Sequence, residues 1–539
     1  MKHSAIHTAL LLFLALAPSG TARIIRADPA TYTQFLTSLT AGDTLALAAG
    51  RYTNNMTLKG ISGTAEAPVV IMGSPALYST VFQAQSCCNT VSITQCAYLV
   101  IKNLRLDGNN EQVDAVKGEG TNGNWAHHIT LEYLDIVNYS NDQQIVGIST
   151  KCHAWNWTIR RNRIVGAGTG LYLGNSDGDK PFVGGLIEYN VVVNPTGYCM
   201  QIKHQNTGVR DVYPGTAATT RTIIRHNVFS KKENASTGAN ARPNVLLGAF
   251  PAGGAGADDV YEMYGNFVYE NATEALLQAT GNLALYNNVF VNHSDPVGYR
   301  AVYITAQNGF RPRNMSIFHN TVWTANSAGG IRLYNPDPVY TQFCHANAVF
   351  SPLPVSNFTD TLHNVVDTYG NAGLYLARPV TDITSLDLYP RGGALEGAET
   401  PSSPLIQFTH AGQDFNGKEY SWMYRGAYSG SGSNPGWKLQ IDTMPNLSRG
   451  PVSVRPVPVV PEIMLYPQPA VTRMSITSAH SCMACEVVVY NVLGREMRRG
   501  VLSISPGEPA TLDVRGYDPG VYILSLSGAQ QQTRRFIVE

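Results

Sequence analysis

Three lysines recur at similar positions in successive segments of the chain, and their side chains could hold and activate an acidic sugar. Lys117, Lys151 and Lys203 each lie at the end of a short alternating run, and His204 and Gln205 extend the last run. A polyuronate needs cations to hold its carboxylates, and β-elimination needs a base at the carbon next to the carboxylate. Lysine, arginine, histidine or tyrosine can be that base when its pKa is shifted. A row of solvated lysines is the alternative interpretation.

These runs alternate with the period of a β-strand, which separates an inward from an outward set of side chains. The alternation predicts that Ile148, Leu171, Ile202, Ile304 and Leu333 point inward. The outward tyrosines could stack on sugar faces, or could be ordinary strand residues. The predicted catalytic residues are Lys203, Lys151, His204 and Arg332. The predicted substrate-binding residues are Lys117, Tyr172, Gln201, Gln205, Tyr303 and Tyr334.

Two acidic segments offer other chemistry. Asn175, Asp177 and Asp179 place oxygen ligands at alternate positions across a glycine turn, as calcium loops do, and a plain turn closed by Asx side chains is the alternative. Asp258, Asp259 and Glu262 form an acidic cluster beside a glycine-rich stretch. Because a glycoside hydrolase uses two carboxyl groups, this cluster keeps a hydrolase as the second hypothesis.

A repeated pattern indicates how such residues could be positioned. Apolar alternation, an asparagine and further apolar residues recur, with successive asparagines 22 to 39 residues apart from Asn162 onward. Short strands of this kind cannot bury their apolar face alone, so stacked coils are expected, with the asparagines hydrogen-bonded along the stack. Ile129 to Ile136 is a degenerate copy, with Leu134 at the asparagine position. The predicted asparagines are Asn103, Asn162, Asn190, Asn227, Asn266, Asn288, Asn320 and Asn347. The predicted fold class is all-β: a right-handed parallel β-helix plus a small C-terminal β-sandwich.

The ends of the chain differ from this repeat. Residues 1–22 have the basic start, short apolar run and small residues of a cleaved signal peptide, with an uncleaved anchor as the alternative. Residues 23–450 are assigned to the β-helix, with a helical N-terminal cap over Tyr32 to Leu39 and a closing segment over Asp382 to Gly432. Residues 451–461 (PVSVRPVPVVP) read as a proline-rich linker, and residues 462–539 contain five short strands separated by turn signals.

Composition excludes little on its own. Charged residues make up 14% of the chain, and its 38 basic residues balance its 38 acidic ones, so net charge indicates neither a nucleic-acid nor a membrane partner. The eight cysteines of an exported chain invite disulfides. For Cys482 and Cys485 a local structural disulfide or free thiols are expected, because no second CxxC or histidine pair completes a zinc site.

Two resemblances to known families follow from particular motifs. Residues 465–470 (LYPQPA), 489–495 (VYNVLGR), 519–524 (PGVYIL) and 535–539 (RFIVE) resemble the type IX secretion C-terminal sorting domain, whose usual motif has asparagine where Gln468 stands. Residues 41–45 (AGDTL), 50–52 (GRY) and 67–71 (APVVI) resemble the start of chondroitinase B and alginate-lyase-type β-helix chains. The first resemblance implies translocation across the outer membrane. The second implies the fold and leaves lyases, hydrolases and adhesins open.

We therefore expect an exported β-helix protein that is secreted or held at the outer-membrane surface after passage through the periplasm. The expected activity is polysaccharide cleavage, foremost β-elimination of an acidic glycan. The alternatives are a glycoside hydrolase of the same fold and a non-catalytic glycan-binding or adhesin-like surface protein. The expected partners are a polysaccharide and the type IX secretion machinery, with no nucleic acid and a monomeric state. No cofactor is predicted beyond the calcium alternative.

Overall fold

The computed structural model describes residues 22–442 and 464–539, apart from 122, 141, 212–215, 234–235, 468, 478–481, 492–494, 506–507 and 528–530. The predicted signal peptide, except Ala22, and the predicted linker 451–461 lie outside the described residues. The chain divides into two compact units, Met1–Arg449 and Gly450–Glu539. Among the described residues, no helix is both long and apolar enough to cross a bilayer.

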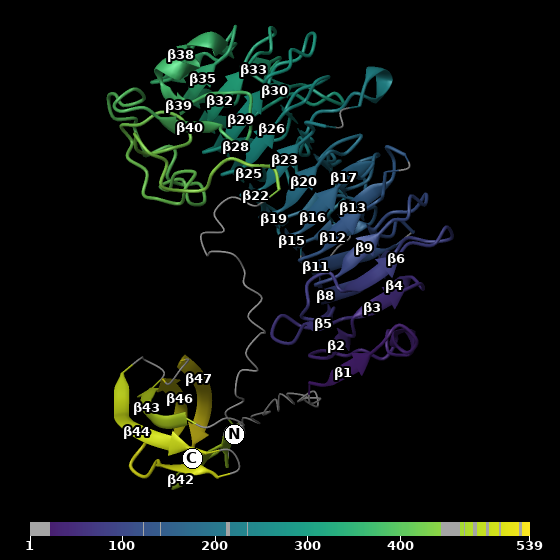
Figure 1. Ribbon diagram of the computed structural model, residues 1–539, viewed down its shortest axis with the longest axis vertical. Helices are drawn as coiled ribbons and strands as arrows, with labels where there is room; N and C mark the ends of the chain where they lie inside the picture. Colours follow the sequence, from purple (N-terminus) through teal and green to yellow (C-terminus); the bar gives the residue numbers. More distant parts are fainter. Residues whose placement is uncertain are drawn as a thin grey trace, which may run out of the picture. The chain divides into compact units, whose positions relative to one another are not determined.

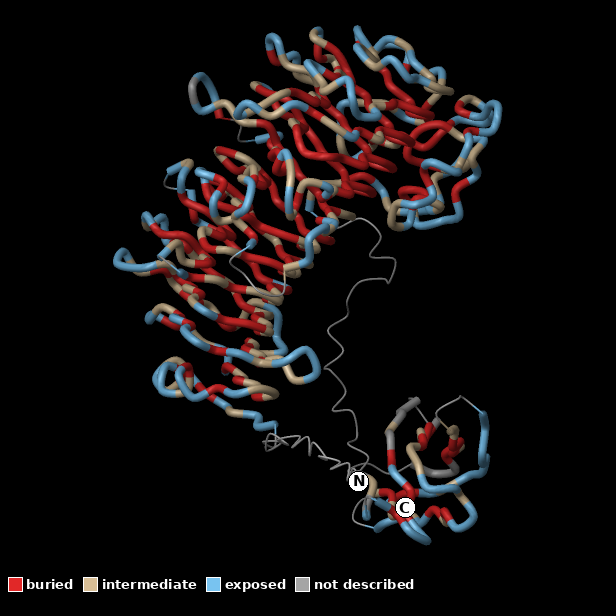
Figure 2. Tube along the Cα trace, turned by 180° about the vertical axis from the view of Figure 1, so that it is seen from behind, coloured by how far each residue is buried: buried red, intermediate tan, exposed pale blue. Residues whose placement is uncertain are grey.

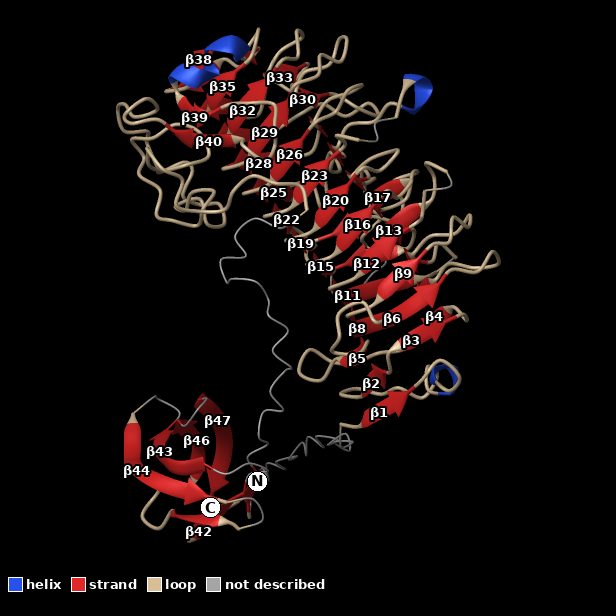
Figure 3. Ribbon diagram, in the orientation of Figure 1, coloured by secondary structure: helices blue, strands red, loops and turns tan. Residues whose placement is uncertain are grey.

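The described part of the first unit is a right-handed parallel β-helix built from three long parallel sheets (Figures 1 and 3). Sheet A has 15 described strands, in order β1 (Ile24–Ala27), β2 (Thr44–Leu47), β5 (Val69–Met72), β8 (Cys96–Lys102), β11 (Trp125–Glu132), β15 (Thr158–Arg160), β19 (Leu186–Glu188), β22 (Arg221–Arg225), β25 (Val260–Tyr264), β28 (Leu283–Tyr286), β31 (Met315–Phe318), β34 (Gln342–His345) and β37 (Asp360–Leu362), with β14 (His153–Trp155) and β18 (Phe182–Val183) alongside.

Sheet B has 12 described strands: β3 (Gly50–Tyr52), β6 (Thr80–Gln83), β9 (Arg105–Asp107), β12 (Asp135–Val137), β16 (Arg163–Val165), β20 (Val191–Val193), β23 (Val228–Ser230), β26 (Phe267–Tyr269), β29 (Val289–Asn292), β32 (Thr321–Thr324), β35 (Ala348–Phe350) and β38 (Val365–Asp367). Sheet C has 11: β4 (Met56–Lys59), β7 (Val91–Thr94), β10 (Val116–Gly118), β13 (Val146–Thr150), β17 (Thr169–Leu173), β21 (Met200–Ile202), β24 (Val245–Leu247), β27 (Leu277–Ala279), β30 (Val302–Thr305), β33 (Ile331–Tyr334) and β36 (Val355–Ser356).

The core of the solenoid is the stack of inward side chains from all three sheets. Ile148, Leu171, Ile202, Ile304 and Leu333 are all buried there, which confirms the alternation predicted for sheet C. In Figure 2 the buried residues follow the strands, and the exposed residues follow the connecting loops. Each strand buries its inner face only because the coils above and below pair with it.

An asparagine ladder runs through the turn after sheet A. The side chain of Asn227 accepts bonds from the backbone and side-chain nitrogens of Asn190, each at 2.9 Å, and its Nδ2 donates to Ile187 O and Asn266 Oδ1. The ladder comprises Asn162, Asn190, Asn227, Asn266, Asn288, Asn320, Asn347 and Asn364.

One predicted ladder member is wrong. Asn103 has a left-handed backbone with φ of 58° and aligns with Tyr133 and Arg161, one position before the ladder. Leu134 takes the ladder position, as predicted, and its backbone N–H donates to Asn162 Oδ1 at 2.9 Å. Asn364 extends the ladder by one coil beyond the predicted set.

The segments outside the coils cover the solenoid in two ways. A 3-10 helix, η1 (Tyr32–Gln34), stands where the sequence predicts a helical cap, and Tyr32 is buried against the first coils. The segment predicted to close the other end lies instead along the sides of sheets A and B. Its Thr409 O accepts from Tyr286 OH of β28, and its Ala427 N donates to Thr321 Oγ1 of β32. The outward aromatic residues of those sheets provide the apolar surface that holds it.

Four further elements lie in or beside the loops of this unit. They are η2 (Gly238–Asn240), η3 (Tyr369–Leu374), β39 (Leu376–Arg378) and β40 (Asp387–Pro390). The last two strands pair antiparallel.

The second unit is the predicted small β-sandwich. One antiparallel sheet contains β41 (Met464–Tyr466), β42 (Arg473–Thr477) and β45 (Ala510–Asp513), and the other β43 (Cys482–Asn491), β44 (Glu496–Ile504), β46 (Gly520–Ser527) and β47 (Gln531–Val538). Met474, Val489, Leu524 and Phe536 are buried in one shared core. Cys485 is disulfide-bonded, whereas Cys87, Cys88, Cys96, Cys152, Cys199 and Cys344 are free.

Candidate functional site

The outward positions of sheet C lie in register along the solenoid. Lys117 of β10 pairs with Ser149 of β13, Ser149 with Tyr172 of β17, and Tyr172 with Gln201 of β21. The row continues through Leu246, Gln278, Tyr303, Arg332 and Ser356. Stacked strands are ~4.8 Å apart, so side chains from successive coils can act on one extended ligand.

Lys117, Lys151 and Lys203, which we call the lysine cluster, lie close enough for the charges of Lys117 and Lys203 to act on Lys151, and two of the three approach one tyrosine. Lys151 Nζ lies 3.2 Å from the centroid of the Tyr172 ring, and Lys203 Nζ lies 5.6 Å from it. Lys117 Nζ forms a salt bridge of 3.1 Å with Asp114. The Tyr172 hydroxyl is 2.7 Å from Ser176 Oγ. The predicted cations from different coils therefore meet at the β10–β21 part of the sheet.

Burial changes the pKa of Lys151 and of Lys203. It lowers the pKa of Lys151 to about 8; Asp114 opposes the change, and the charges of Lys117 and Lys203 add to it. Burial also lowers the pKa of Lys203, with Asp177 opposing and Arg242 assisting. A lysine with a pKa near 8 is partly neutral at mildly alkaline pH, so Lys151 can accept a proton there.

The residues that follow Lys203 behave differently from one another. His204 stays at the edge of the site, with its Nδ1 3.2 Å from Asn308 Nδ2, and burial lowers its pKa. Gln205 is only 1% exposed, and its Oε1 accepts from Arg210 Nη2 at 2.8 Å. Gln201 is also buried. Substrate contact by Gln205 therefore has no support from its position, because the loop that carries Arg210 covers it.

Arg332 lies in a second group of side chains rather than with the lysines. Its guanidinium carbon is 5.3 Å from the Tyr334 ring centroid. The guanidinium carbon of Arg300 is likewise 5.4 Å from the Tyr303 ring centroid. The Tyr303 and Tyr334 centroids are 6.5 Å apart. We call these four residues the arginine–tyrosine cluster. Because β33 is four strands from β21 in the sheet, Arg332 is ~19 Å along the stack from Lys203, and the structure does not bring the two together.

Glu274, Arg242 and Tyr198 are part of this face, and the sequence analysis missed them. Glu274 is buried; its Oε1 accepts from Gln278 Nε2 at 2.8 Å and its Oε2 from Ala275 N. Burial raises the pKa of Glu274 to about 7. The guanidinium carbon of Arg242 is 5.8 Å from the Tyr198 ring centroid. Arg242 and Glu274 each stand three residues before a strand of sheet C, so aligning those strand starts would have found both.

The residues of the predicted calcium loop hydrogen-bond to one another. The Asn175 amide donates to the Asp179 carboxylate, and Asn175 Oδ1 accepts from Lys180 N at 2.9 Å. Both bonds are made between residues of the loop itself. Asp177 stands close enough to Lys203 and His204 to favour their charged forms. Calcium binding at this loop stays a prediction.

Two residues of the acidic cluster that suggested a hydrolase, Asp259 and Glu262, are buried and ion-paired. Asp259 is buried, forms an ion pair with Arg210 and accepts from Thr220 N at 2.7 Å. Glu262 is fully buried, forms an ion pair with Arg221 and accepts from Thr409 N at 2.9 Å. These two carboxylates tie loops to sheet A, so they are not placed to attack a sugar.

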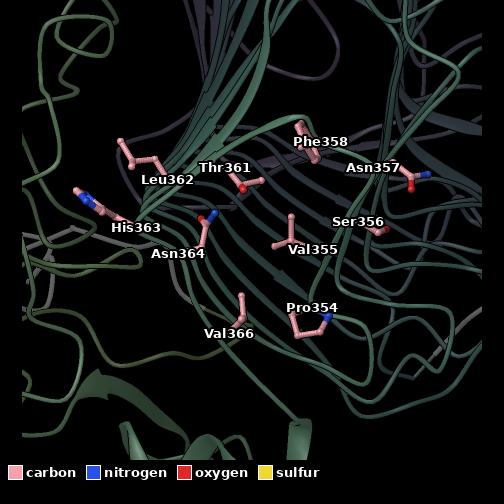
Figure 4. Close-up of a pocket in the computed structure, with 10 residues that line it drawn as sticks. All are labelled: Pro354, Val355, Ser356, Asn357, Phe358, Thr361, Leu362, His363, Asn364 and Val366. Atoms are coloured by element: carbon pink, nitrogen blue, oxygen red, sulfur yellow. The ribbon is translucent and has the colours of Figure 1, made fainter.

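A hollow of about 460 Å³ lies at the last coil, where Ser356 ends the outward row of sheet C. Figure 4 shows its lining, which includes Val355, Phe358 and Leu362 and the final ladder residue Asn364. β36, β37 and β38 are the last described strands of sheets C, A and B. The hollow is therefore at the end of the stack, several strands away from the lysine cluster.

The comparisons with known proteins concern both units. The model of the secretion system C-terminal sorting domain matches residues 464–539. None of the curated proteins matches the chain in sequence. Among solved structures, an alginate lyase from Paenibacillus sp. str. FPU-7 is 14% identical, with 64% of this chain and 99% of that chain covered and a TM-score of 0.36. Pectate lyase Pel9A is 12% identical, with 77% and 97% covered and a TM-score of 0.36. A GH136 lacto-N-biosidase from Eubacterium ramulus is 10% identical, with 64% and 67% covered and a TM-score of 0.39.

The second unit is thus a secretion system C-terminal sorting domain. The protein is exported through the type IX system to the cell surface or the extracellular space, as the sequence motifs predicted. The first unit is the exported cargo, a right-handed parallel β-helix.

Proposed function

We propose that this exported β-helix protein cleaves an acidic polysaccharide by β-elimination on the outer face of sheet C. The observation that carries the proposal is Lys151, an amine with a pKa near 8 held among other cations and against an aromatic ring. Such a group can take a proton at mildly alkaline pH, while its neighbours attract the carboxylate that makes the proton acidic.

Each side chain has a role in the proposed reaction. Lys203 and Lys117 hold the carboxylate of an acidic sugar, and Tyr172 supports Lys151. Lys151 Nζ removes the proton from the ring carbon next to the carboxylate. The electron pair of that C–H bond forms a C=C bond with the neighbouring carbon as its bond to the glycosidic oxygen breaks. The departing oxygen takes a proton from solvent.

The experiment is an activity screen with matched variants. Full-length protein is incubated with alginate, pectate and glycosaminoglycans, and the ultraviolet absorbance of the new C=C bond is followed. Lys151→Met is expected to abolish the signal. Lys59→Met is expected to leave it unchanged, because Lys59 is an exposed lysine on β4 of the same sheet. The absence of product from every acidic glycan would overturn the proposal. Retention on a glycan array without product would favour a binding protein instead.

A further inference from the structure

The charges along sheet C change sign between its two clusters. The lysine cluster spans β10 to β21, and Arg242 precedes β24. Glu274 then precedes β27 and bonds Gln278, an outward residue of that strand. Beyond it come Arg300 and Tyr303, then Arg332 and Tyr334 (β30 and β33 in Figure 1). Between the two clusters, the outward side of sheet C therefore carries an acid, Glu274, and an amide, Gln278.

The positions of these two residues are fixed. Leu246, Gln278 and Tyr303 pair in register on successive strands, so Gln278 stands directly between the two positive regions. From β21 to β30 is three strand steps, ~14 Å along the stack. Both carboxylate oxygens of Glu274 are fixed by donors, Gln278 Nε2 and Ala275 N, so the acid cannot turn away from the row.

We infer that the site takes an anionic glycan whose acidic groups are separated by neutral sugar units. This inference rests on the proposed function. One carboxylate sits at the lysine cluster and a later one at the arginine–tyrosine cluster, while a neutral unit lies over Glu274 and Gln278. The amide of Gln278 and the apolar Leu246 side chain suit a neutral, hydrogen-bonding sugar. A third carboxylate at this point would face Glu274, and like charges repel across a partly buried surface.

The ionisation of Glu274 gives a second, independent readout. The charged and titratable groups that face it are Lys231, Arg242, Tyr198 and Tyr299. Lys231 and Arg242 come from the connection between β23 and β24, Tyr198 from that between β20 and β21, and Tyr299 from that between β29 and β30. Because its pKa is about 7, Glu274 is mostly neutral at pH 6 and mostly charged at pH 8. Discrimination against a carboxylate over Gln278 should therefore strengthen as the pH rises from 6 to 8.

The test compares two oligosaccharides of equal length on the full-length protein. A hyaluronan octasaccharide alternates uronate with a neutral amino sugar, whereas a mannuronate octamer is acidic at every unit. Binding is measured by calorimetry at pH 6 and pH 8, and any product is followed in the same samples. At pH 8 the alternating oligosaccharide is expected to bind about tenfold more tightly, which is the effect of one like-charge contact near a surface. At pH 6 the difference between the two affinities should be smaller.

Variants assign the effect to the acid. Glu274→Gln is expected to bring the two affinities together at both pH values by strengthening binding of the octamer. Gln278→Glu adds a negative charge at the same point and is expected to increase the ratio of the two affinities. The two variants test the same interaction in opposite directions, so one of them suffices if the other fails to fold. Glu399→Gln, a change at an exposed glutamate, should leave the ratio as it is.

The possible failures can be told apart. Equal or tighter binding of the mannuronate octamer, or a ratio that neither variant changes, would overturn the inference and leave the proposed function standing. Failure to bind or cleave either oligosaccharide, or any other acidic glycan, would overturn both.

Discussion

Lys151 Nζ lies 3.2 Å from the centroid of the Tyr172 ring. The ring favours the charged ammonium, because the face of an aromatic ring is electron-rich. Burial and the neighbouring charges of Lys117 and Lys203 favour the neutral amine and lower the pKa to about 8. The two influences leave a lysine that is held in one place and can change its charge near physiological pH.

The first prediction concerns the pH dependence of activity. A base must be unprotonated to act, and the neutral fraction of Lys151 rises as the pH passes through about 8. The ratio kcat/KM should therefore increase from pH 7 to pH 9 with an apparent pKa near 8. The measurement is the initial rate of C=C formation across this range. The same rates are measured for Tyr172→Phe, which keeps the aromatic ring beside Lys151 and removes the hydroxyl. A flat profile, or one that falls with rising pH, would exclude Lys151 as the base.

The second prediction separates the charge of Lys151 from its basicity. Lys151→Arg keeps a cation beside Tyr172, but a guanidinium does not lose its proton in a protein. Turnover should fall by about 10²–10⁴, the usual contribution of a general base, while the affinity for an acidic oligosaccharide changes little. Steady-state kinetics and calorimetry on the same preparation measure the two quantities. Lys59→Arg is the control, and near-normal turnover of Lys151→Arg would show that position 151 supplies only charge.

The sequence predicts the fold more completely than it predicts the candidate site. Period-two alternation and the recurring asparagine specify the coils, because one face of each strand must be buried and the same turn recurs. The local pattern could not place Asn103 one position outside the ladder, since that depends on backbone conformation. The burial of Gln205 and the separation of Arg332 from Lys203 depend on loop packing and on coil order. Glu274 lies in a connecting turn, outside the alternating runs that identified the other candidates.

The third prediction tests the asparagine ladder. Asn227→Ala removes four side-chain hydrogen bonds in mid-stack and leaves the backbone N–H of Asn190 without its acceptor. The free energy of unfolding of the β-helix should fall by ~1–3 kcal/mol, the cost of leaving a buried polar group unpaired. Denaturant unfolding of the variant beside Asn54→Ala, a change at an exposed asparagine, measures it. Identical midpoints for the two variants would mean that the ladder does not stabilise the fold.

The fourth prediction concerns acid stability. His319 is fully buried beneath Tyr420, and neither ring nitrogen has a hydrogen-bond partner. Burial lowers the pKa of His319 from 6.5 to about 3. Between these two pH values the imidazole is protonated in the unfolded chain and neutral in the folded chain. Above pH 6.5 the titration of this histidine does not change the stability. Below it, each buried histidine of this kind removes about 1.4 kcal/mol of stability per pH unit.

His319→Phe should therefore flatten the loss of stability between pH 6.5 and pH 4, whatever it does to stability at neutral pH. Thermal or denaturant unfolding at several pH values gives the slope. His410→Phe is the matched control, because His410 has the same left-handed backbone but an exposed side chain. Parallel slopes for the parent and His319→Phe would show that this histidine is not the group that titrates.

The fifth prediction concerns export. The sorting domain has its own core, formed by residues such as Met474, Val489 and Phe536, and is a compact unit separate from the β-helix. Deleting residues 462–539 should therefore leave the stability and any activity of the β-helix intact while the protein stays in the periplasm. Cell fractionation and thermal unfolding of the truncated protein measure the two effects. Fusion of the same residues to an unrelated exported protein should carry that protein to the surface. A truncated chain that still reaches the surface, or that unfolds, would mean that these residues stabilise the solenoid instead of directing its export.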